Sequence, residues 1–188
     1  MNKWKIAFFT LIALLLVGVV VVIRLATVPF ETAMPAVAES PEGNVVAVQT
    51  TTPEFEAIAK QYVDEALKNS PVPIDLSIGD EIYLSGEFSV FGIGVPIQMD
   101  FEPLIHEGNI RLRQTNVHVG KLNIPPQAVL KIMNDAVDFP DWITVRPKEE
   151  ELYVDLSRIT IADNSKVRAK KIDLQNDEII LEVIIPNN

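Results

Sequence analysis

The sequence predicts an α+β protein in which an N-terminal transmembrane helix is followed by an antiparallel β-meander domain with two helices. Three observations support this fold class. The chain opens with a long uncharged apolar run at residues 6–23. Two later segments repeat apolar residues at the helical period, and the segments around them alternate apolar and polar residues at the two-residue period of strands. Such alternation indicates sheets buried on one face, which favours antiparallel hairpins over a parallel arrangement.

The apolar run, IAFFTLIALLLVGVVVVI, would form a helix about 27 Å long, close to the roughly 30 Å hydrocarbon core of a bilayer. The alternative is a cleaved signal peptide, whose apolar region is usually about 7–15 residues long and lies just before its cleavage site. The best cleavage motif here, Ala36-Val37-Ala38, lies well beyond the run. We therefore expect residues 1–25 to hold a cytoplasmic start and a single-pass anchor that binds the cell membrane through residues 6–23.

The orientation of this anchor follows from its flanking charges. Lys3 and Lys5 precede the run and Arg24 alone follows it, so the positive-inside rule places the N-terminus in the cytoplasm. The remainder of the chain is then extracytoplasmic.

Residues 26–51 are rich in Ala, Val, Thr, Pro, Glu and Ser and show no sustained apolar period. We expect a flexible tether there, with a reach on the order of 30 Å. The alternative for Val45 to Val48 is an added edge strand. An extracytoplasmic α+β domain should then cover residues 52–188.

The first amphipathic helix of this domain should be capped by Thr52, with Pro53 at its first helical position. Its apolar residues recur at i, i+3, i+4 and i+7, and they are Phe55, Ile58, Ala59, Tyr62, Val63, Ala66 and Leu67. The turn residues Asn69-Ser70-Pro71 should end it. We expect this face to pack on the core, and a partner-binding face is the alternative.

After Pro73 the period changes from helical to alternating. Strands are expected at 74–78, 82–90, 95–101, 110–119, 143–145, 152–156, 167–174 and 179–185. A second helix, QAVLKIMNDAV, should follow Pro125 and Pro126. The predicted order is helix, strand meander, helix, strand meander.

Charge and composition exclude several classes of function. The net charge is −10, and all 26 acidic residues lie beyond Leu25, so nucleic acid is a poor partner. No cysteine is present to form disulfides, and no phosphate-binding, hydrolase-elbow, zinc-protease or dinucleotide motif occurs. His106 and His118 lie in ordinary turn and strand contexts. We therefore expect a non-enzymatic protein without a metal or cofactor.

Three features suggest ligand contacts, each with a structural alternative. An apolar hairpin tip carries Phe91 and Ile93, and it could be buried in the core or contact a lipid or protein. Two large aromatics follow the second helix and could belong to the core or to a ligand rim. A basic strand face could be balanced by neighbouring carboxylates or bind a phosphate or anionic headgroup. The candidates are Phe91, Ile93, Phe139, Trp142, Lys166, Arg168 and Lys170.

Four segments of the chain resemble the YpmS family of Gram-positive bacteria. They are the MNKWK start, GKLNIP at 120–125, PDWITVRP at 140–147 and KIDLQNDEIILEV at 171–183. This family of single-pass envelope proteins is uncharacterised, so the resemblance supplies no site residues. Its element order is similar to extracytoplasmic domains of the TULIP kind, in which a curved sheet wraps a helix and can leave a lipid-sized groove.

Two functions from different classes remain open at this point. The first is a membrane-anchored module that binds or handles lipid in the cell envelope. The second is an interaction or regulatory subunit that recruits an envelope enzyme. A continuous apolar cavity would favour lipid, whereas a solid core would favour a protein partner.

Overall fold

A computed structural model describes residue 17 and residues 43–90, 93–120, 122, 124–159, 161 and 164–187. The chain divides into two compact units, and all the strands and helices named below lie in the unit Met34–Asn188. Among the described residues, no helix combines the length and apolar character needed to cross a membrane. The predicted anchor at residues 6–23 lies outside the described residues except for Val17, so the anchor remains a prediction.

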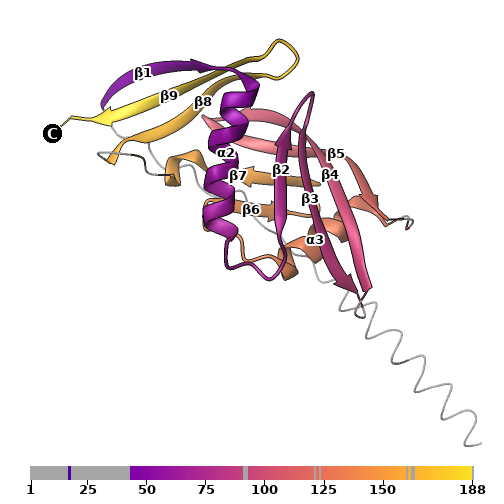
Figure 1. Ribbon diagram of the computed structural model, residues 1–188. Coiled ribbons are helices and arrows are strands. Elements are labelled where there is room, and N and C mark those ends of the chain that lie inside the picture. The colour runs from indigo at the N-terminus through magenta and orange to yellow at the C-terminus, as the bar shows by residue number, and fades with distance from the viewer. Residues whose placement is uncertain are drawn as a thin grey trace, which may run out of the picture. The chain divides into compact units, whose positions relative to one another are not determined.

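The described domain contains two antiparallel sheets and two α-helices (Figure 1). In chain order the elements are β1 Gly43–Thr50, α2 Thr52–Leu67, β2 Ile74–Ile78, β3 Ile82–Val90, β4 Ile93–His106, β5 Asn109–Val119, α3 Pro126–Ala136, β6 Ile143–Arg146, β7 Glu151–Val154, the short 3-10 helix η1 Leu156–Arg158, β8 Lys166–Asp173 and β9 Glu178–Pro186. One sheet has the order β1-β9-β8, and the other has the order β2-β3-β4-β5-β7-β6. The α+β class and the antiparallel pairing are therefore confirmed.

Three details differ from the sequence-based expectations. The tether predicted for residues 26–51 extends too far toward the C-terminus, because its last part, Gly43–Thr50, forms β1 and pairs with β9. The edge-strand alternative for Val45 to Val48 is the correct one. Helix α2 begins one residue earlier than expected, with Thr51 as its N-cap and the Glu54 carboxylate accepting the Thr51 N–H at 3.3 Å. Finally, β7 lies between β5 and β6, so the last strands do not form a simple meander.

The core lies where both helices and the six-stranded sheet meet. Its most deeply buried apolar residues include Met99 and Phe101 of β4 and Leu130 and Met133 of α3, which are at most 1% exposed. These residues come from segments that are predicted correctly from periodicity alone. Burial of their side chains supplies the main stabilising free energy in a chain without disulfides.

The tight turn between β4 and β5 of the six-stranded sheet contacts β8 of the three-stranded sheet. Glu107 and Gly108 both have positive φ, 51° and 80°, as a two-residue hairpin turn of the primed type requires. The Ala169 N–H of β8 donates to the Gly108 carbonyl oxygen at 2.7 Å. A Cβ at position 108 would lie 3.0 Å from Arg168 Cβ, so glycine serves both the φ angle and the close approach of β8.

A buried ion network joins β5, β6 and β7. The Glu151 side chain is 1% exposed, and it accepts hydrogen bonds from Arg146 and, at 2.9 Å, from Arg111 Nε. Two guanidinium groups therefore compensate one desolvated carboxylate. Removing that carboxylate would leave Arg146, itself only 11% exposed, without its main counter-charge.

We predict that Glu151→Ala lowers the free energy of unfolding by about 3–5 kcal/mol, because it removes the nearest carboxylate from the largely buried Arg146 guanidinium. Urea unfolding of the full-length protein in micelles, followed by far-ultraviolet circular dichroism, would measure the change. The matched control is Glu102→Ala, which breaks the exposed Glu102–Arg113 pair and should cost about 1 kcal/mol or less. Equal losses in the two variants would contradict this role for Glu151.

Candidate ligand-binding site

An apolar cavity of about 240 Å³ lies between α2 and the sheets. Twenty-three residues line it. They come from α2, from seven of the strands, from the segment before β6, and from η1 and the segment after it. None of them is charged. The only polar side-chain atoms in the lining belong to the Tyr62 hydroxyl and the Trp142 indole. A cavity with this lining offers water almost no hydrogen-bond partners, so it suits a hydrocarbon.

Helix α2 forms one wall of the cavity through the face that its periodicity predicts. Phe55, Ala59 and Val63 are half-buried along this wall, whereas Ile58 and Tyr62 are 52% and 41% exposed. All five residues line the cavity, and Ile58 and Tyr62 also reach solvent. The exposure of Ile58 and Tyr62 therefore marks where the cavity approaches solvent.

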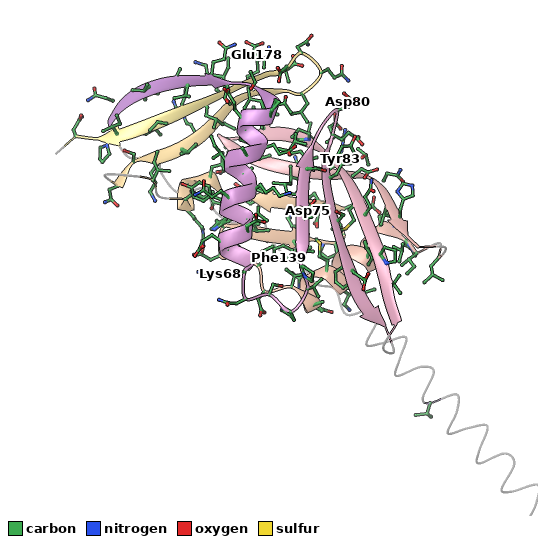
Figure 2. All side chains as sticks on the ribbon, viewed as in Figure 1. Lys68, Asp75, Asp80, Tyr83, Phe139 and Glu178 are labelled. Carbon is green, nitrogen blue, oxygen red and sulfur yellow. The ribbon has the colours of Figure 1, made fainter. Side chains whose placement is uncertain are left out.

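Polar contacts hold α2 along its side that faces β2. The Thr52 N–H donates to Asp177 Oδ1 at 2.6 Å, the Ile78 N–H donates to Glu56 Oε2 at 2.6 Å, and Lys60 Nζ lies 2.6 Å from Asp75 Oδ1. Asp75 projects from β2 beside the helix (Figure 2). These contacts fix α2 close to β2 and to the β8–β9 turn. Ile74, Leu76 and Ile78 of β2 also line the cavity, which extends from there to the strands farther along the sheet.

The opposite wall is a contiguous apolar patch on β5, β7 and β6. Val154 pairs in register with Ile110 on one side and with Ile143 on the other, and Leu112 pairs with Leu152. All five residues line the cavity. Because paired residues of antiparallel strands lie on the same face, the alternation in the sequence produces this wall directly.

The two candidate aromatics are brought together at the cavity. Phe139 and Trp142 both line it, and Figure 2 shows Phe139 near the C-terminal end of α2. Sequence reasoning left open whether they belong to the core or to a ligand rim. Both side chains are half-buried on the cavity wall, and Phe139 also packs against the core.

The side chains of the hairpin-tip candidates lie outside the part of the chain that the structure describes. Phe91 lies outside the described residues, and Ile93 opens β4 opposite Val90, with its side chain outside the described part. The β3 residues that line the cavity are Ile82 and Leu84, at the other end of that strand.

The basic candidates lie on β8 but face away from the cavity. Val167 of β8 lines the cavity, so its neighbours Lys166 and Arg168 project to the opposite face. Arg168 Nε and Lys170 Nζ lie 2.5 Å and 2.9 Å from the two oxygens of Glu182. Hydrogen bonds lower the pKa of the Glu182 carboxyl; the one from Lys170 has the larger effect and the one from Arg168 the smaller. This arrangement favours the interpretation of a basic face balanced by carboxylates.

Sequence reasoning missed several cavity residues, notably Ile58 and Tyr62, which it assigned to core packing, and Ile159 and Ile161 after η1. No local signal distinguishes a residue that lines a cavity from one in a filled core. Within the described residues, no group of three or more His, Cys, Asp or Glu side chains is placed to hold a metal ion.

Comparisons with known proteins give a family without an assigned activity. A family model described as "Uncharacterized protein conserved in bacteria (DUF2140)" matches residues 2–185. The chain is similar to "Uncharacterized protein YpmS" of Bacillus subtilis (strain 168), with 29% identity over 180 residues and 95% of each chain covered. No solved structure matches the chain significantly. The resemblance noted in the sequence is therefore confirmed.

The Glu182 contacts generate a pH prediction. Because the folded-state pKa of Glu182 is lowered below 4.5, its stabilising contribution is complete above pH 4.5 and is lost as the pH falls through the folded-state pKa. We expect Glu182→Gln to unfold at a lower temperature than the unmodified protein at pH 7, with the difference shrinking in acid. Thermal unfolding by circular dichroism at several pH values would test this. Asp80→Asn in the exposed β2–β3 turn is the control and should change little.

Proposed function

The chain belongs to the DUF2140 family, and we propose that it is a membrane-anchored, non-enzymatic protein whose extracytoplasmic domain binds a hydrocarbon chain of an envelope lipid. One observation carries this proposal. The cavity beneath α2 has a volume of about 240 Å³ and no charged residue in its lining.

The free energy of an empty cavity supports an apolar occupant. Cavities in cores cost about 24 cal/mol per Å³, so this volume corresponds to a penalty on the order of several kcal/mol. That penalty is comparable with a large part of a domain's net stability of about 5–15 kcal/mol. An apolar ligand would recover part of it through dispersion contacts and burial of its own surface. Water would not, because the lining gives it few partners.

The size of the cavity limits what enters it. An apolar cavity of about 150 Å³ holds a benzene molecule, whereas sites for larger ligands usually measure about 300–1,000 Å³. The 240 Å³ available here suits part of one acyl chain. The remainder of the lipid would lie outside, near the exposed Ile58 and Tyr62.

The proposed location brings the cavity near its ligand. Residues 6–23 would anchor the chain in the cell membrane, and by the positive-inside rule the lysines before them would put the described domain on the outer side. A lipid-binding cavity tethered to its own bilayer meets a high local concentration of ligand. Recruitment of an envelope enzyme is the function expected if no lipid enters.

We predict that Ala59→Trp abolishes lipid access to the cavity, because Ala59 lines it and an indole would fill it. The probe is a fatty acid with a photoactivatable diazirine on its chain, added to membranes that contain the full-length protein. Labelled peptides identified by mass spectrometry should include residues of α2 and the 139–161 region. Ala57→Trp, on the exposed face of α2, is the matched control and should keep the labelling.

Labelling of residues 6–23 provides an internal standard in every variant, since the anchor should always contact lipid. Circular dichroism would show whether Ala59→Trp keeps the fold. Labelling confined to the anchor in the unmodified protein would contradict lipid binding by the cavity and favour the enzyme-recruiting alternative.

The topology yields a separate prediction, which the absence of cysteine makes simple to test. A cysteine placed at Asn187, which is exposed, should react with a membrane-impermeant maleimide in intact cells. A cysteine at Asn2 should react only after the membrane is permeabilised, because that end is expected in the cytoplasm. The reverse pattern would contradict the proposed orientation.

A further inference from the structure

The outer edge of β1 is a second surface suited to recognition, separate from the cavity. β1 forms one margin of the three-stranded sheet and pairs with β9 on one side (Figure 1). On its other side, no strand in the described part of the chain pairs with it. Its outward N–H and C=O groups therefore form a template for one more strand.

This edge lacks the features that usually prevent pairing. Its sequence, GNVVAVQT, contains no charge and no proline, and its register with β9 runs from Gly43 to Thr50 without a bulge. Val45, Val46 and Val48 are 49%, 47% and 43% exposed. Natural edge strands are normally protected by lysine, proline, bulges or short length. An uncharged, eight-residue strand in which four residues are β-branched is instead suited to strand addition.

We propose that β1 pairs antiparallel with β1 of a second copy of this chain, so that two three-stranded sheets become one six-stranded sheet. A two-fold axis normal to the sheet keeps opposing residues on the same face, so one residue must pair with itself. With Ala47 on the axis, Val46 lies opposite Val48 of the second copy. An axis at Val46 would instead place Asn44 opposite Val48, which breaks the apolar pairing.

The charges around β1 favour a second copy over a strongly charged partner. The chain as a whole carries a net charge of −10, so two copies repel each other over most of their surface. Around β1 the charges nearly cancel, because β8 and β9 together carry four basic and three acidic residues. Glu182 lies directly opposite Ala47 and is already paired with Arg168 and Lys170. The β1 edges of two copies can therefore pair without bringing uncompensated charges of the same sign together.

The experiment uses cysteine crosslinking of the full-length protein in membranes, since the natural chain has no cysteine. Directly opposed residues of antiparallel strands have Cα atoms about 4.5–5.5 Å apart, within the range for a disulfide. Mild oxidation of Ala47→Cys should therefore shift the protein from 20.9 kDa to twice that mass on a non-reducing gel.

Two matched variants test the register and the surface. In the proposed pairing the two copies of Val46 are diagonal, about 7–8 Å apart, which is too far for ready disulfide formation. Val46→Cys alone should give little dimer, but Val46→Cys mixed with Val48→Cys should crosslink. Ala57→Cys on exposed α2 controls for random collision. In addition, Val46→Lys should convert the uncrosslinked dimer to monomer in light-scattering measurements, with the circular dichroism spectrum unchanged.

Failure of Ala47→Cys to dimerise, or equal dimer from Ala57→Cys, would overturn the proposal. So would an adduct between Ala47→Cys and a different protein, which would assign the edge to another partner. None of these outcomes depends on lipid in the cavity.

Discussion

The position of α2 is the constraint on which the cavity depends. Polar contacts tie the helix to β2 and to the β8–β9 turn. Across the cavity lies the apolar patch of β5, β7 and β6. If the helix were free to move toward these strands, the hydrophobic effect would close the space. The ion pair and the two backbone hydrogen bonds oppose that movement, so a hydrocarbon-sized space remains beside a filled core.

Strand β1 contributes to the same constraint because it leads directly into α2. Its register with β9 sets Thr50 opposite Ile179, and Thr52 then meets Asp177 of the preceding turn. The N-terminal end of α2 is thereby fixed to the three-stranded sheet, while Glu56 and Lys60 fix it to the six-stranded sheet. The end of the segment interpreted from sequence as tether is thus part of what positions the cavity.

Charge is kept away from the cavity by the alternation of the strands. On β8, Val167 lines the cavity, and the basic residues beside it lie on the other face with Glu182. On β7, Leu152 and Val154 line the cavity, and Glu151 lies on the other face with its two arginines. A one-residue slip in either strand would bring a carboxylate or a cation into the apolar space. Both ion networks therefore favour the register that keeps the cavity dry.

The sequence by itself determined the α+β class, the positions of most strands and both helices, and the family, because hydrophobic period and local motifs are encoded in neighbouring residues. Two of the candidates that it named, Phe139 and Trp142, line the cavity. Only the tertiary structure decided that β1 joins the domain, that β7 inserts between β5 and β6, and that Ile58 and Tyr62 border a cavity. Those outcomes depend on contacts between segments far apart in the chain. Periodicity specifies which face of an element is buried, but the partner of that face, and the space left beside it, follow from how the elements pack.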